Sequence, residues 1–256
     1  MTTQELPTIS VFTVTPQNPK EREDTVVEGV KAALSFADEV ICFHCRPTDG
    51  TLEELKAIGD DRVKIIDGGD WELDRFVVGR KKNAALQHCT MDWCLLMDAD
   101  EVFECPDVLA FKQELKKEVN AFKLRYLHFF SSPWLIKTAK SGFYQWKPSL
   151  FRNHAGNFIG GKGIMSNTEM DKYARPLVGH SGKLSEEVFR IFHYGHCKTD
   201  TITWAKKVNQ LEATYEDDGH GQCDPKKFGY GMDNTEKFTG KHPETMIERV
   251  SKWSRV

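Results

Sequence analysis

Apolar residues in the first hundred positions of the chain follow two alternating patterns. Short runs rich in β-branched residues, which favour strands, alternate with stretches in which apolar residues recur three or four positions apart, as on the buried face of a helix. These patterns predict strands over residues 8–14, 39–44, 62–66 and 93–97, and helices over residues 26–34, 52–58 and 76–88. Strands that alternate with helices are typical of βαβ units, so we expect a mostly parallel sheet flanked by helices.

The pattern changes after a predicted helix at residues 107–117. Residues 121–130 and 142–151 form longer, aromatic and partly alternating segments, which are typical of antiparallel or edge strands. A helix over residues 201–215 is predicted next. The tail from Glu216 is rich in Gly, Asp and Lys and is expected to be loop.

Length, charge and cysteine content limit the class of protein. A chain of 256 residues can bury a full core, and we expect one continuous α/β domain with halves at residues 1–120 and 121–256. The formal net charge of −3 gives no basic field for nucleic acid. No apolar run approaches the roughly 18 residues that span a bilayer, and no secretory signal is recognisable. Seven cysteines fit reduced thiols, so we expect a cytoplasmic protein, with peripheral membrane attachment left open.

The strongest candidate for chemistry is the acidic segment that directly follows the fourth predicted strand. One residue separates Asp98 from Asp100, and at this spacing both carboxylates can reach Mg²⁺ or Mn²⁺. The tripeptide alone is too common to be diagnostic. Its position matters more, because ligands of open α/β sheets bind at the carboxyl ends of the strands. A solvated loop with a helix cap is the alternative at this point.

Several segments, taken in chain order, resemble the family 2 glycosyltransferases of the GT-A fold. They include the first strand with its loop, a loop after the second strand, a basic-Asn-Ala helix start, the strand with its DXD motif, and three later segments. In sequence these read ISVFTVTPQN (9–18), PTDGT (47–51), RKKNAAL (80–86), WCLLMDADEVF (93–103), WKPSLFRN (146–153), FHYG (192–195) and GKHP (240–243).

The resemblance implies a Rossmann-like GT-A fold and transfer of a sugar from a nucleotide-sugar donor, with inversion at the anomeric carbon. Glycans, lipid-linked saccharides and other hydroxyl compounds are the implied acceptors. Residues 1–120 would bind the donor and a divalent metal, Mn²⁺ or Mg²⁺, and residues 121–256 would bind the acceptor. The implied metal ligands are Asp98, Asp100 and His193. The implied donor-binding residues are Thr13, Thr15, Asp49, Asp70, Arg80, Lys82, Asn83 and Asp98.

Two implied features concern the base catalyst and the nucleobase. An inverting transfer needs a carboxylate that accepts the proton of the acceptor hydroxyl, and Glu169, or else Asp171, lies in the right part of the chain. Where the family commonly carries acidic residues after the second strand, this chain reads His-Cys-Arg at residues 44–46. Contact with the base would then pass to Asp67 or Asp70.

Three other interpretations remain open from the sequence. A zinc site could use Cys42 and Cys45 with the thiol and imidazoles of residues 193–197, although residues i and i+3 of a strand point to opposite faces. A nucleotidyltransferase also uses paired carboxylates, but no Gly-rich phosphate loop is present. A non-catalytic glycan-binding module could stack sugars on aromatic side chains, the candidates being Trp134, Phe143, Tyr144 and Trp146.

Overall fold

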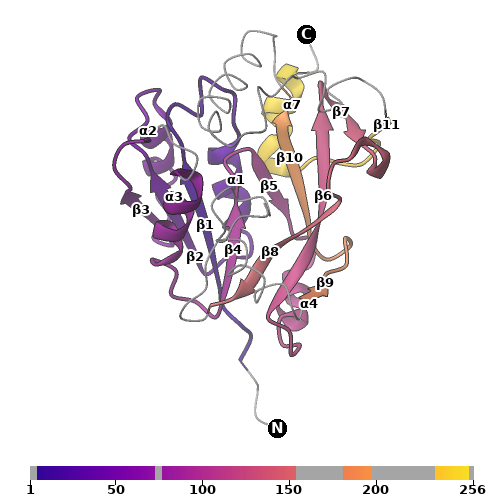
Figure 1. The fold of residues 1–256 in the computed structure, drawn as a ribbon, viewed down its shortest axis with the longest axis horizontal. Helices are drawn as coiled ribbons and strands as arrows, with labels where there is room; N and C mark the ends of the chain where they lie inside the picture. The colour runs from indigo at the N-terminus through magenta and orange to yellow at the C-terminus, as the bar shows by residue number, and fades with distance from the viewer. Residues whose placement is uncertain (1–4, 73–76, 154–180, 198–233, 254–256) are drawn as a thin grey trace, which may run out of the picture.

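The computed structural model describes residues 5–72, 77–153, 181–197 and 234–253. Its centre is a large mixed sheet in the order β11-β7-β6-β8-β4-β1-β2-β3. Figure 1 shows β2 and β3 towards one side of the molecule and β6, β7 and β11 towards the other. Four of these strands are parallel: β1 (Ile9–Thr15), β2 (Glu39–His44), β3 (Val63–Asp67) and β4 (Trp93–Met97).

Helices cover both faces of the parallel strands. Because neighbouring strand residues point to opposite faces, Val11 packs with α1 (Val26–Ala33) whereas Phe12 packs with α3 (Val77–Leu86). The same face also holds α4 (Val108–Glu114) and α2 (Thr51–Lys56), which connects β2 to β3 along the chain. Since β1 pairs with β2 on one side and β4 on the other, the strand order reverses at β1, where such sheets place their ligand sites.

The second half of the chain extends the same sheet with antiparallel strands. β8 (Trp146–Arg152) lies between β4 and β6 (Ala121–Phe130) and runs antiparallel to both. β7 (Ser132–Lys137) and β11 (Thr235–Lys237) complete that end, and β9 (Ser181–Lys183) pairs with β6. The two halves therefore share one hydrogen-bonded sheet.

One late strand returns to the acidic segment. β10 (Arg190–His196) pairs antiparallel with β5 (Glu101–Glu104), which three residues separate from β4, and parallel with β6. Behind it, the short helix η2 (Glu244–Met246) and α7 (Ile247–Trp253) pack against β10 through a cluster that contains Phe192, Tyr194 and Trp253. The sheet register thus brings the C-terminal region to the DXD strand.

The predicted α/β class and the four parallel strands are confirmed, with shifts of one residue at strand ends. The predicted strand at 142–151 begins only at Trp146, because the 3₁₀ turn η1 (Ala139–Ser141) and Gly142, with φ +82°, precede it. The expectation that the tail from Glu216 is loop is wrong where the tail is described, since β11 and α7 form there. The predicted helix at 201–215 lies outside the described residues.

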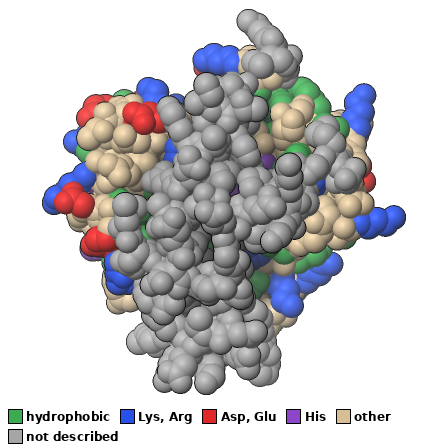
Figure 2. Space-filling view, turned by 45° about the horizontal axis from the view of Figure 1, so that its top comes forward, with side chains coloured by type: hydrophobic (Ala, Val, Ile, Leu, Met, Phe, Trp, Pro, Cys, Tyr) green, Lys and Arg blue, Asp and Glu red, His purple; other side chains and the backbone are tan. Residues whose placement is uncertain are grey.

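The surface and the helices add two observations. On the face shown in Figure 2, Asp and Glu side chains lie beside Lys and Arg on the left, whereas Lys and Arg predominate on the right. Within the described part of the chain, no helix combines the length and the apolar character that crossing a bilayer requires.

Candidate functional site

The acidic segment forms a tight turn at the carboxyl end of β4. Its backbone is held on two sides, because the amide of Thr25 donates to the carbonyl of Ala99 (2.9 Å) and the amide of Asp98 donates to Oε2 of Glu101 (3.0 Å). Gly29 of α1 lies so close that a Cβ there would be 2.6 Å from the carbonyl oxygen of Glu101. The turn is therefore fixed by α1 and by its own buried glutamate.

Two lysines from different elements hold Asp98. Nζ of Lys82, on α3, lies 2.5 Å from Oδ1, and Nζ of Lys147, on β8, lies 3.4 Å from Oδ2. Burial alone would raise the pKa of Asp98, but the charges of the two lysines outweigh it and hold the pKa well below the ordinary value. Asp98 is thus a carboxylate at neutral pH with a cation on each side.

Glu101 is buried next to Asp98, with an exposed fraction of 1%. Burial, together with the charge of Asp98, raises the pKa of its carboxyl to about 8, so it is mostly protonated at neutral pH. A neutral Glu101 adds no negative charge beside the aspartates. Its role here is to accept the amide hydrogen bond of Asp98.

Asp100 faces a histidine of β10. Nε2 of His193 lies 3.6 Å from Oδ1 of Asp100, and the amide of Tyr194 donates to the carbonyl of Asp100 (2.8 Å). Both side chains are largely buried. Gly195 permits the approach, because a Cβ at that position would overlap Oδ2 of Asp100 and lie 2.8 Å from Cε1 of His193.

A second histidine, His128, contacts His193. Nδ1 of His128, on β6, lies 3.3 Å from Nδ1 of His193, and Nε2 of His128 lies 2.7 Å from the carbonyl oxygen of Tyr144. His128 is 1% exposed, and burial, with the neighbouring His193, lowers its pKa well below the ordinary value. The site therefore contains a neutral buried imidazole in contact with the one that faces Asp100.

Comparison with known proteins identifies the family of the chain. A family model described as glycosyl transferase family 2 matches residues 18–169, more than half of the sequence. The chain belongs to glycosyl transferase family 2. The predicted family is confirmed, and the matched range contains β2, β4 and the acidic turn.

Solved structures agree with this assignment at the level of the fold. Crystal structures of S. aureus TarS 1-349, alone and in complex with UDP-GlcNAc, share 12% identity with this chain at a TM-score of 0.50 and cover 81% and 80% of it. The chain spans 65% of the length of TarS 1-349, which is less than two thirds. At this identity the likeness shows the GT-A fold. No curated protein sequence matches the chain.

Two donor-site residues predicted for this family 2 chain lie at the end of β1. Thr13 and Thr15 are fully buried, and neither hydroxyl oxygen has a hydrogen-bond partner in the described structure. Asp49 instead anchors loops, because its carboxylate accepts from the backbone and hydroxyl of Thr51 and from the amide of Lys20.

The predicted residues of α3 separate in space. Lys82 reaches Asp98. Arg80 is half exposed and donates to Glu72 (2.9 Å), and the side-chain amide Nδ2 of Asn83 donates to the carbonyl of Gly79 (2.8 Å). On the spacing of a helix, residues 80 and 82 cannot share one face. The geometry therefore brings Lys82 to the acidic turn, whereas Arg80 and Asn83 are held elsewhere.

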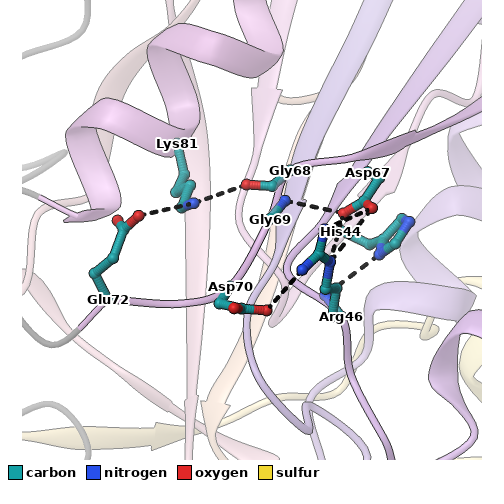
Figure 3. A network of polar contacts seen from close by, with 8 residues as sticks. All are labelled: His44, Arg46, Asp67, Gly68, Gly69, Asp70, Glu72 and Lys81. Atoms are coloured by element: carbon teal, nitrogen blue, oxygen red, sulfur yellow. Dashed lines mark hydrogen bonds and ion pairs between the residues drawn. The ribbon is translucent and has the colours of Figure 1, made fainter.

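Polar side chains also meet where β2 and β3 end (Figure 3). Arg46, with φ +46°, donates to both carboxylate oxygens of Asp67 and, through Nη1, to Asp70 (3.2 Å). The guanidinium holds the pKa of Asp67 below its usual range. Nearby, Nζ of Lys81 donates to the carbonyl of Gly68 (2.7 Å). We call the group of Arg46, Asp67 and Asp70 the arginine clamp.

Three predictions from the sequence concern the general base, the metal ligands and a zinc site. Glu169 and Asp171 lie outside the described residues. Among the residues that are described, no three carboxylate, imidazole or thiol side chains already converge as a metal cage. Cys42 packs on the α1 face of the sheet and Cys45 on the α3 face, so the two thiols of the zinc interpretation point apart.

Sequence reasoning did not select Lys147, His128 or Glu101 as site residues. Lys147 lies in the segment at 146–153 that resembles the family, so its signal was present. It became specific only when β8 paired with β4. His128 has no local sequence signal, because its contact with His193 depends on the pairing of β6 with β10.

Proposed function

We propose that this chain transfers a sugar from a nucleotide-sugar donor to a hydroxyl acceptor, with inversion at the anomeric carbon and with the help of a divalent cation. The observation that carries the proposal is the approach of Asp100 and His193 beside Asp98 at the carboxyl edge of the sheet, in a family 2 chain. Paired carboxylates with an imidazole are suitable ligands for Mn²⁺.

The residues present fit such a cation. Ligand atoms around one metal lie about 3 Å apart when each is about 2.1 Å from it, and Nε2 of His193 already lies 3.6 Å from Oδ1 of Asp100. The missing Cβ of Gly195 permits both groups to lie this close to the backbone of β10. When bound, Mn²⁺ or Mg²⁺ would supply Lewis-acid stabilisation of the charge on the departing nucleoside diphosphate.

Lys82 and Lys147 suggest how the site receives the diphosphate. Their ammonium groups flank Asp98, and Lys82 is 6% exposed. Phosphate oxygens can accept from both lysines in place of the carboxylate, which would leave Asp98 available to the donor ribose or to the cation. On this proposal the lysines bind the donor, Asp100 and His193 hold the cation, and Asp98 contacts both.

The nucleobase would lie near the arginine clamp. Both aspartates proposed to contact the base are bonded to Arg46, so this edge offers guanidinium donors and carboxylate acceptors together. TarS has been crystallised in complex with UDP and with UDP-GlcNAc. Uridine diphosphate sugars are therefore the first donors to test.

The acceptor side of the reaction concerns the general base and the hydroxyl compound. An in-line attack needs a general base, and Glu169 is our proposed candidate, with Asp171 as the second. The acceptor would be a glycan, a lipid-linked saccharide or another hydroxyl compound, and a cytoplasmic location remains part of the proposal.

The test is donor hydrolysis by purified protein with UDP-, GDP-, CMP- and dTDP-sugars, with Mn²⁺ and with EDTA. We expect release of the nucleotide from one donor class, only with the cation, and a loss of about 10²-fold or more in Asp98→Asn and Asp100→Asn. Asp60→Asn is the matched control, because among the described residues the Asp60 carboxylate bonds only to Arg62.

Different results would favour the alternatives. Pyrophosphate release from a nucleoside triphosphate would indicate a nucleotidyltransferase. Glycan binding that both aspartate variants retain, with no binding of any nucleotide sugar by calorimetry, would indicate a binding module. Either outcome would overturn the proposed function.

A further inference from the structure

His128 and His193 occupy paired positions of the parallel strands β6 and β10, so the sheet register places both rings on the same side. His193 is also opposite Glu101 of β5, which sets it beside the acidic turn. The contact between the two imidazoles therefore follows from backbone pairing across 65 residues of sequence. It does not depend on a flexible side chain.

The donor and acceptor roles of the two histidines can be assigned by starting from the carbonyl of Tyr144. The carbonyl oxygen of Tyr144 can only accept, so Nε2 of His128 carries the proton in the 2.7 Å contact. A neutral His128 then has a lone pair on Nδ1. That lone pair accepts from Nδ1 of His193 at 3.3 Å, which leaves the lone pair of a neutral His193 on Nε2.

We propose that His128 is a positioning residue that fixes the tautomer of His193, so that the Nε2 lone pair of His193 points to the carboxylate of Asp100 and the two form a ready pair of cation ligands. This inference deepens the proposed function and rests on it. A lone pair facing a carboxylate at 3.6 Å is unfavourable unless a proton or a cation lies between them. A metal ion between His193 and Asp100 would meet this condition, as a proton on Nε2 would.

The ring of His128 is itself held firmly. It stacks on Tyr126 at 5.6 Å between centroids and meets Phe143 and Tyr144 at 5.2 and 4.7 Å. This packing and the Tyr144 carbonyl prevent the ring from turning to present Nε2 to His193. A metal-ligating histidine whose second nitrogen is bonded in this way binds its metal more tightly, typically by 10- to 100-fold.

The experiment has one readout that needs neither metal nor donor. Nitrogen-15 spectra of the metal-free protein, at a mildly alkaline pH where neutral imidazoles predominate, report which ring nitrogen carries the proton. We expect Nδ1–H on His193 and Nε2–H on His128. In His128→Phe, which keeps a buried ring but has no acceptor, His193 should shift towards Nε2–H.

The second readout is the affinity for Mn²⁺ in the presence of UDP, measured by electron paramagnetic resonance. We expect His128→Phe to bind about 10-fold or more weakly. His128→Asn, whose Oδ1 can accept near the position of Nδ1, should lose less. His242→Phe is the matched control: it removes a part-buried imidazole that bonds to Tyr194 and does not contact His193.

Three outcomes would overturn the inference. These are Nε2–H on His193 in the metal-free wild type, unchanged Mn²⁺ affinity in His128→Phe, or an equal loss in His242→Phe. If the wild type has the expected tautomers but binds no Mn²⁺, the proposed cation site fails and the role of His128 fails with it. If it binds Mn²⁺ with the other tautomer, only the inference fails.

Discussion

Nζ of Lys82 lies 2.5 Å from Oδ1 of Asp98, which links the first turns of α3 to the carboxyl end of β4. This ion pair is largely buried, so removing Asp98 would leave the ammonium group of Lys82 uncompensated, whereas removing Lys82 would leave Asp98 with Lys147 alone. It also joins the cation proposed to receive the diphosphate to the first aspartate of the DXD motif.

Lys82→Met should therefore weaken donor use. We expect kcat/KM for donor hydrolysis to fall about 100-fold, because a cation proposed to bind the departing diphosphate is lost and the pKa of Asp98 rises. Arg80→Met should cost much less, since its guanidinium bonds to Glu72. Steady-state kinetics of both variants measure the difference, and equal losses would contradict the assignment of Lys82.

Gly195→Ala should separate Asp100 from His193. The added Cβ would overlap the carboxylate and press on the imidazole, so we expect Mn²⁺ affinity to fall about 10-fold, with a stability loss of about 1–3 kcal/mol. Gly59→Ala is the control, because φ +66° strains it while its Cβ meets nothing nearer than 3.9 Å. Calorimetry with Mn²⁺ should find normal affinity in the control, and a normal affinity in Gly195→Ala as well would refute the proposed cation position.

Arg46→Gln tests the arginine clamp. The variant frees Asp67 and Asp70 and removes the donors proposed to face the base, so KM for the nucleotide sugar should rise about 10-fold while kcat changes little. Arg62→Gln should alter stability alone, because Arg62 bonds to Asp60 and to the carbonyls of Leu34 and Ala37. A fall in kcat with unchanged KM in Arg46→Gln would place the clamp away from the base.

Glu101 predicts a pH dependence of stability. Its pKa is raised from 4.5 to about 8 in the folded state, so the folded protein binds a proton that the unfolded chain has lost over this range. The contribution of this group to the free energy of unfolding is complete below pH 4.5 and is lost as the pH rises through 8. Glu101→Gln keeps the acceptor for the amide of Asp98 and removes the titration.

Thermal unfolding in EDTA between pH 6 and 9 would measure this effect. Glu101→Gln should lose less stability than the wild type as the pH rises, and Glu248→Gln, a change at an exposed pair with Lys252, should follow the wild type. Parallel curves for wild type and Glu101→Gln would show that Glu101 is ionised in the folded state at neutral pH.

The parallel strands could be predicted from the sequence because each is a short apolar run buried on both faces, as in Trp93–Met97. β5 could not, because Glu101 and Glu104 make it polar and only its pairing with β10 forms the strand. α7 was missed because only Val250 and Trp253 on one face are buried. In both elements tertiary contacts outweigh the local pattern.

The site was predictable where chemistry is local in sequence. Asp98 and Asp100 could be selected from their spacing after a buried strand, and His193 from its segment. Lys147 contacts Asp98 and His128 contacts His193, and both come from strands that are distant in sequence. The hydrophobic pattern of a strand does not show which residues of another strand it will pair with. Lys82 was likewise not distinguishable from Arg80 before its ion pair with Asp98 was known.

The pairing of β4 with β8 also determines how the protein can be divided. Cys94 and Leu95 are opposite Phe151 and Leu150, so the strand that carries the DXD motif is completed by a strand from the second half. A fragment ending near residue 120 would expose the backbone of β4 as an apolar edge, and such edges recruit other chains into aggregates. Attempts to isolate a minimal donor-binding module should therefore retain the chain through Arg152.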